Sequence, residues 1–193
     1  MDDCTRYGCN HSNPIIVHEG GIILRQAAYA DDTPPSPDRG PRLRLRLFGQ
    51  MVVDDHRGQT YLPRTRKTRA LLAILAMLSP KPMLRLHLAS LLWSRRENEQ
   101  ARASLRQSVH ELQDTLGADW NHLFVTDRHH LSLRGTELDI DTLSLIEPAE
   151  ISAELLGRYD DVLLEDLDGL DPAFDRWLED ERGRFARIRR TIG

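Results

Sequence analysis

The chain contains 193 residues, of which 40% are hydrophobic, and this is enough for one ordinary domain or two small ones. Its 26 basic and 30 acidic side chains give a net charge of −4, which by itself favours neither a polyanion nor a membrane surface as partner. No stretch approaches about eighteen consecutive apolar residues, and residues 1–13 lack a signal-peptide core. We therefore expect a cytoplasmic protein with no membrane span.

The charge is distributed unevenly along the chain. Residues 42–116 hold fourteen basic and six acidic side chains, a net charge of +8, whereas residues 117–193 hold nine and eighteen, a net charge of −9. Residues 1–41 carry −3 and are expected to form a flexible tail and a proline-rich linker. A chain divided in this way is better described as two modules than as one neutral domain.

The tail itself offers few signals. Apolar residues from Ile15 to Leu24 could form a short hairpin, which would be only marginally stable alone. Cys4 and Cys9 are the only cysteines, and we expect two reduced thiols and no metal site, because no further ligands follow at zinc spacing.

The basic module begins with a predicted small antiparallel sheet. Arginine and leucine alternate from Arg42 to Leu47, which places the leucines on one buried face of a strand. Met51–Val53 and Gln59–Leu62 are predicted to be two further strands of a meander that ends at Pro63.

Three helices are predicted next. Apolar residues recur at helical spacing from Ala70 to Leu78, after a basic opening, and a second helix fits Leu84 to Trp93. In the second helix the side chains expected to face inward are Leu84, Leu88, Leu91 and Leu92. The third helix is expected over about residues 97–116; Ser94 and Glu97 have capping-box spacing, although the helix could begin a few residues later.

The third helix has an apolar stripe and a polar face. The stripe consists of Leu105, Val109, Leu112 and Leu116, and the opposite side carries Arg102, Arg106, Gln107, His110, Gln113 and Asp114. Arginine, glutamine and histidine side chains can reach base edges and phosphates in a major groove, although a merely solvated face would have the same composition. A hairpin is predicted after it, with strands at Leu123–Thr126 and His130–Leu133. The order is that of an α+β winged helix.

Four ordered blocks carry a resemblance to a known family. They are RLRLFG at 44–49, LPRTRKTRALLA at 62–73, LASLLW at 88–93 and QARASLRQSVHEL at 100–112. From about Arg42 onward the chain resembles the antibiotic-regulatory-protein (SARP) type of bacterial transcriptional activator, which combines an OmpR/PhoB-like winged helix with a helical bacterial transcriptional activator domain. The resemblance implies that the third helix enters the major groove of double-stranded DNA and that the hairpin, or wing, touches the adjacent minor groove. It also implies that monomers line up on direct repeats near a promoter and recruit RNA polymerase.

The resemblance assigns candidate DNA-contacting residues by position. They are Arg102, Arg106, Gln107 and His110 on the third helix, Thr126 and Arg128 on the wing, and Trp93 at the end of the second helix, which could equally be a core residue. Arg66, Lys67 and Arg69 are candidates for phosphate neutralisation, or simply a solvated helix start.

The chain departs from the family's pattern at two places. Gln113 and Asp114 stand where many relatives have two arginines, and Asp114 with Glu111 brings negative charge toward the phosphates. His130-Leu131 replaces a glycine-aromatic pair in the wing. These departures predict a DNA affinity that is reduced or depends on a partner. We expect His129 and His130 to be turn residues with no metal role.

The acidic end is predicted to be helical. One helix is expected from Pro148 to Gly157 and another from Pro172, with one apolar face formed by Phe174, Trp177, Leu178, Phe185, Ile188 and Ile192. Residues 158–178 resemble the opening of the activator domain, which here would be shortened. The apolar face must then be covered by the winged helix, by a second copy or by another protein.

These observations lead to two hypotheses. No catalytic motif is present, so we expect neither an enzyme nor a cofactor. The leading hypothesis is a sequence-specific DNA-binding transcription regulator at the nucleoid, with a tail at 1–41, a winged helix at 42–136 and a shortened activator domain at 137–193. The alternative is a protein-interaction adaptor or inhibitor that keeps the winged-helix fold with weak or no DNA binding.

Overall fold

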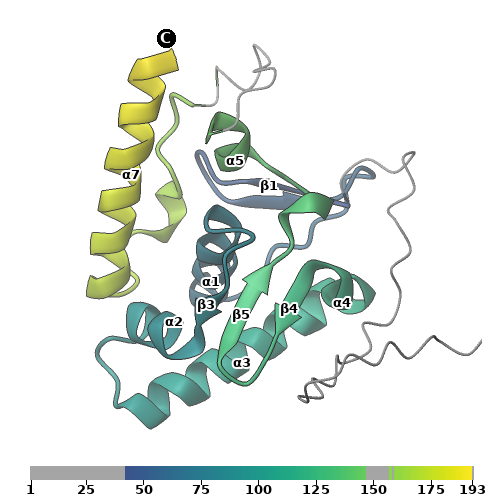
Figure 1. Ribbon diagram of the computed structural model, residues 1–193, viewed down its shortest axis with the longest axis vertical. Helices are drawn as coiled ribbons and strands as arrows, with labels where there is room; N and C mark the ends of the chain where they lie inside the picture. Colours follow the sequence, from purple (N-terminus) through teal and green to yellow (C-terminus); the bar gives the residue numbers. More distant parts are fainter. Residues whose placement is uncertain (1–41, 147–156, 158, 193) are drawn as a thin grey trace, which may run out of the picture. The chain divides into compact units, whose positions relative to one another are not determined.

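The computed structural model describes residues 42–146, 157 and 159–192, which form a mixed α+β structure (Figure 1). The strands are β1 (Leu43–Arg46), β2 (Val52–Asp54), β3 (Met83–Leu84), β4 (Phe124–Thr126), β5 (His130–Leu133) and β6 (Leu138–Ile140). The helices are α1 (Arg66–Met77), α2 (Arg85–Leu92), α3 (Asn98–Leu116), α4 (Trp120–Leu123), α5 (Asp141–Ile146) and α7 (Pro172–Ile192). The predicted tail, its hairpin and cysteines, and nearly all of the helix predicted at 148–157 lie outside the described residues.

The first sheet has the order β2-β1-β6, and the alternation in β1 gives it a buried leucine face. β2 pairs with β1 antiparallel, as predicted, and β6 pairs with β1 parallel. The strand predicted at Gln59–Leu62 is wrong, because this segment contributes only an isolated bridge between Asp54 and Thr60. The Asp55 carboxylate accepts hydrogen bonds from the backbone N–H groups of Arg57 and Gln59, and this closes the turn early.

α1 is the central helix of the hydrophobic core. Thr65 is its N-cap, and every residue from Ala70 to Met77 is buried. α2 follows from the short strand β3, which was not predicted. The expectation that Leu84 faces inward is wrong: its side chain is 53% exposed, because it lies in β3, where successive residues point to opposite faces.

α3 ends at Leu116, followed by Gly117 with a positive φ, as the sequence predicts. Its apolar stripe is buried against the core. The capping box is wrong, since Glu97 takes the N-cap position without a side-chain hydrogen bond. Ser94 instead donates hydrogen bonds to the carboxylate of Asp171, which is distant in the sequence.

The predicted hairpin is present and belongs to a second sheet with the order β3-β5-β4. Phe124 lies opposite Leu133 and Thr126 opposite Leu131 across the antiparallel pair. β3 adds to the other side of β5. The hairpin is therefore tied to the start of α2 through β3.

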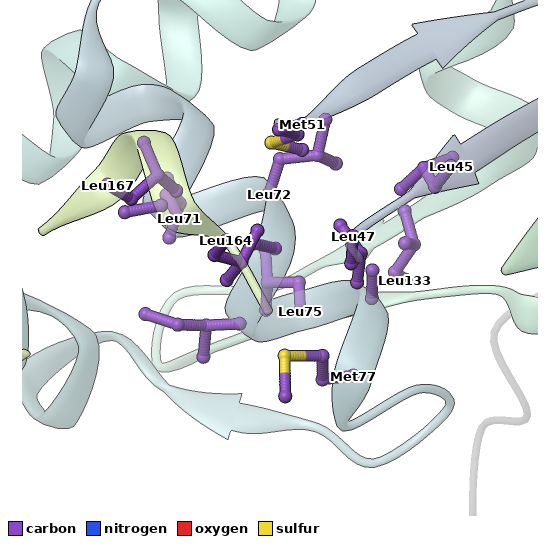
Figure 2. Close-up of a cluster of buried hydrophobic side chains, with 14 of the residues drawn as sticks. Leu45, Leu47, Met51, Leu71, Leu72, Leu75, Met77, Leu133, Leu164 and Leu167 are labelled. Atoms are coloured by element: carbon purple, nitrogen blue, oxygen red, sulfur yellow. The ribbon is translucent and has the colours of Figure 1, made fainter. Parts of the chain in front are cut away.

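The acidic end shares the core of the basic region. The backbone N–H of Leu164 donates to the Leu47 carbonyl at 2.8 Å, and the N–H of Gly49 donates to the Val162 carbonyl at 3.0 Å. Figure 2 shows Leu164 and Leu167 among the leucines of α1. The division of the chain at residue 136 stays a prediction, but β6 and these two leucines join the segments on its two sides.

α7 begins at Pro172, as predicted, and its apolar face is covered from within the chain. Phe174, Leu178 and Phe185 are buried, whereas Trp177 and Ile188 are partly buried. The side chain of Ile192 is outside the described part. α7 packs against α2, which belongs to the segment predicted to be the winged helix, and against α5 of the C-terminal segment. The apolar face of α7 is therefore covered partly by the first of the three predicted covers and partly by its own segment.

A buried carboxylate connects α5 to the end of β1. Asp141 is 1% exposed, and its Oδ2 accepts hydrogen bonds from the backbone N–H groups of Leu47 at 2.8 Å and Phe48 at 3.1 Å. Burial raises the pKa of Asp141 to about 6, although these hydrogen bonds oppose the shift.

The raised pKa of Asp141 predicts a pH effect on stability. The folded protein holds this proton more tightly than the unfolded chain, whose carboxyl has a pKa of 3.8. The stabilisation is complete below about pH 4 and is lost as the pH rises through about 6, on the order of 3 kcal/mol. We expect the free energy of unfolding of wild type minus that of Asp141→Asn, measured in urea, to fall by this amount across the window. Asp139→Asn, the control, keeps the wild-type profile. An Asp141→Asn profile parallel to wild type would contradict this assignment.

Candidate nucleic-acid interface

The outward face of α3 is polar over its whole length. Arg102, Arg106, Gln107, His110 and Gln113 are all exposed, as the sequence predicts. The opposite face, which includes Leu105, Val109 and Leu112, is buried in the core. A helix anchored in this way presents its polar side chains on a rigid element.

The polar side chains of α3 differ in whether they have partners. Arg102 pairs with Glu99 at 3.1 Å, and His110 lies 3.7 Å from Asp114, both at exposed positions. Within the described residues, Arg106 and Gln107 have neither a hydrogen bond nor an ion pair through their side chains. Their donors are therefore available to a ligand at the middle of the helix.

Glu111 does not belong to the outward face, which corrects the expectation that it adds negative charge there. Its carboxylate turns toward α1, where it accepts hydrogen bonds from the Thr65 N–H at 2.8 Å and from the hydroxyls of Thr65 and Thr68 at 2.7 Å each. Burial of the Glu111 carboxyl raises its pKa, but these hydrogen bonds outweigh burial and leave the pKa below its usual value. Asp114 remains exposed.

The wing turn is held by the carboxylate of Asp127. It accepts hydrogen bonds from the N–H groups of His129 and His130 at 2.6 Å each, which hold the pKa of Asp127 below its usual value. Arg85 donates through Nε to the Asp127 carbonyl at 3.0 Å. Among the described residues no group of His, Cys, Asp and Glu side chains could hold a metal ion. His130 Nδ1 also lies 3.1 Å from the Asp127 carboxylate.

Two predicted wing residues are exposed beside this turn. Thr126 ends β4, and Arg128 lies within the turn. No described residue forms an ion pair or hydrogen bond with the Arg128 guanidinium. Arg128 thus presents a positive charge without a described partner at the tip of the β4–β5 hairpin.

The remaining four predicted residues lie elsewhere and contact the C-terminal segment or the core. Arg66 donates to the carbonyls of Asp166 at 2.7 Å and Asp168 at 2.8 Å. Arg69 donates to the Pro63 carbonyl at 2.7 Å and lies 3.6 Å from the Asp166 carboxylate.

Lys67 and Trp93 form the other pair of this group. Lys67 donates to the Leu92 carbonyl at 2.6 Å, and its Nζ lies 5.4 Å from the centre of the Trp93 ring. Burial lowers the pKa of Lys67, and Asp171, 3.6 Å away, opposes this shift. Trp93 is 5% exposed and belongs to the core. The structure therefore separates these four residues from the α3 and wing residues.

Sequence reasoning missed one basic pair, Arg95 and Arg96, in the turn between α2 and α3. Both are exposed, and Arg96 donates to the Ser104 hydroxyl of α3 at 2.6 Å. The signal was available, because two adjacent arginines directly precede the third helix.

Comparison with known proteins gives a likeness of fold. No protein-family model matches the chain, and no curated protein matches it. The structure is similar to that of Mycobacterium tuberculosis EmbR, solved in complex with a low-affinity phosphopeptide, with a TM-score of 0.61 and 19% sequence identity. The match covers 78% of this chain and 43% of EmbR, so the chain spans less than half of that protein. The likeness shows that the matched part of this chain shares its fold with EmbR.

The structure also bears on the membrane. None of the helices in the described ranges is long and apolar enough to cross a bilayer.

The contact of Glu111 with α1 predicts a measurable contribution to stability. Glu111→Gln removes the charge that strengthens three hydrogen bonds, two of them exposed, so we expect the free energy of unfolding at neutral pH to fall by about 1 kcal/mol. Because the pKa of Glu111 is lowered in the folded protein, this contribution is present above the unfolded pKa and is lost as the pH falls through the folded value. Urea unfolding at several pH values measures it. Asp114→Asn, on the same helix but exposed, should change stability little, and equal effects of the two variants would refute the stabilising contact of Glu111 with α1.

Proposed function

We propose that this protein is a sequence-specific DNA-binding transcription regulator. In this proposal α2 and α3 form a helix-turn-helix, α3 enters the major groove, and the β4–β5 hairpin is the wing. The observation that carries the proposal is the pair of unpartnered donors, Arg106 and Gln107, at the centre of an exposed helix that the core holds rigidly. The SARP-like sequence blocks and the fold likeness to EmbR support it.

The chemistry of these side chains suits base recognition. An arginine can bind guanine O6 and N7 with two hydrogen bonds, and a glutamine can bind adenine N6 and N7 in the same way. Successive residues Arg106 and Gln107 would then read neighbouring positions. Arg102 and His110, about one turn away on either side, would reach flanking bases or phosphates.

The wing and the turn supply the backbone contacts. Arg128 at the wing tip would contact a phosphate or the minor groove, and Arg95 in the turn before α3 would neutralise another phosphate. Because Arg66, Lys67 and Arg69 are engaged within the molecule, we assign them to the fold and not to DNA. Fewer basic side chains are then available to contact DNA, so we expect a moderate affinity for DNA.

The resemblance extends this proposal beyond a single chain. By analogy with the SARP-type activators, we expect the chain to self-associate on direct repeats and to recruit RNA polymerase. Double-stranded DNA is the partner to test first, because the geometry of α3 bears on it directly.

Selection from a random-sequence duplex pool tests the function. We expect the purified chain to enrich a defined sequence and to retard it in gels. The logarithm of the binding constant should fall with the logarithm of the salt concentration by about 0.9 per phosphate contact. If no duplex is enriched or retarded at about 50 mM salt, the proposal fails and the adaptor hypothesis takes its place.

Substitutions in α3 and the wing separate recognition from charge. Arg106→Ala should weaken binding to the selected DNA by about 10- to 100-fold and relax the preference at one position. Arg128→Ala should weaken binding to every duplex and reduce the salt slope by about 0.9. Arg176→Ala removes an exposed arginine of α7 and serves as the control. Affinities and preferences equal to the control in both variants would show that another surface binds DNA.

A further inference from the structure

The turn between α2 and α3 is fixed by a residue of the C-terminal helix. Asp171 accepts hydrogen bonds from both the N–H and the hydroxyl of Ser94, the first residue after Trp93. The same carboxylate accepts a hydrogen bond from the Ala173 N–H at 3.2 Å, so it also caps α7. One side chain therefore holds the start of α7 and the start of the turn together.

The Asp171 carboxylate is buried beside a lysine. The Asp171 side chain is only 3% exposed, and Lys67 lies 3.6 Å away. Burial of the Asp171 carboxyl raises its pKa, but the hydrogen bonds from Ser94 and Ala173 and the charge of Lys67 outweigh burial and leave the pKa below its usual value. The Asp171 carboxylate is therefore charged at neutral pH and is held in place by these partners.

Lys67 completes the arrangement from the other side. It donates to the carbonyl of Leu92, the last residue of α2, at 2.6 Å. α1 thus holds the end of α2 through Lys67, and α7 holds the next step of the chain through Asp171. The direction in which the chain leaves α2 is set by both.

The first turns of α3 depend on this direction more than the rest of the helix. From Asn98 to Ser104 only Ala101 is buried, and the continuous apolar stripe begins at Leu105. The N-terminal part of α3, which carries Arg102, therefore has little apolar packing of its own. Its anchors are the turn, where the Arg96 N–H donates to the Trp93 carbonyl at 3.0 Å, and the contact of Arg96 with Ser104.

We infer that Asp171 is a positioning residue for DNA recognition: through its hydrogen bonds to Ser94, the C-terminal helix sets the orientation of the first turns of α3. This inference rests on the proposed function and deepens it. The acidic C-terminal region acts here as a structural part of the DNA-reading unit, and displacement of the start of α7 would be transmitted to Arg102.

Two variants and a matched control test the inference in the full chain. Asp171→Asn keeps a residue that caps α7 but removes the charge, and Ser94→Ala removes the hydroxyl at the other end of the contact. The control is Asp180→Asn on the same helix, an exposed position that does not touch the turn. Ser94→Ala keeps the test valid should Asp171→Asn fail to fold.

The first measurement needs no DNA. Backbone amides from Arg96 to Ser104 should exchange with solvent about tenfold faster in Asp171→Asn and Ser94→Ala than in the control. The second measurement uses the duplex selected by the wild-type chain and a random duplex. Both variants should lose about tenfold in affinity for the selected duplex and none for the random one.

The outcomes separate the inference from the proposed function. Exchange rates equal to those of Asp180→Asn overturn the inference whether or not DNA is bound, and so does an unchanged preference for the selected duplex. If the wild-type chain selects no sequence, the proposed function fails, and a positioning role for DNA falls with it, while faster exchange would still show that Asp171 orders α3.

Discussion

The contact between the basic start of α1 and the acidic C-terminal segment is the constraint on which the rest of the structure depends. Leu164 and Leu167 pack against the leucines of α1 in the hydrophobic core, and the burial of these apolar side chains is favourable. Arg66 then satisfies carbonyls that the chain exposes at Asp166 and Asp168. Arg69 and Asp166, 3.6 Å apart and partly buried, form an ion pair at the same contact, and such a pair adds little net stability. Some basic side chains of residues 42–116 therefore contact the acidic C-terminal segment of the same chain.

This internal pairing decides which cations are left for another molecule. The net charge of +8 on residues 42–116 overstates what a polyanion would meet, because Arg66, Lys67 and Arg69 are engaged by the chain itself. Free donors remain at Arg106 on α3 and Arg128 on the wing. Salt screens the distant charges of a protein, so a phosphate or base at contact distance interacts mainly with the unpaired donors nearest to it. The overall net charge of −4 therefore does not describe the charge at the exposed face of α3.

Carboxylates perform a second, less evident task, because they satisfy backbone groups on distant elements. Glu111 of α3 accepts hydrogen bonds at the start of α1, Asp141 accepts them at the end of β1, and Asp171 accepts one from the turn before α3. The donors of Leu47 and Ser94 lie in buried and partly buried positions, where it would be costly to leave them unpaired. The α3 surface is consequently held by contacts from several parts of the chain.

The sequence by itself determined the elements whose signal is local. The alternation in β1, the spacing from Leu105 to Leu116 and the proline start of α7 all specify structure through residues nearby in the sequence. The exposure of Arg106 follows from the helical periodicity of α3, and that of Arg128 follows from its place in a hairpin turn. Only the tertiary structure decided that β6 pairs with β1, that Ser94 binds Asp171 and that Lys67 serves the fold. A charged or polar side chain has the same local signature whether its partner is water, a phosphate or a residue about a hundred positions away. Which partner it takes is set by the packing of the whole chain.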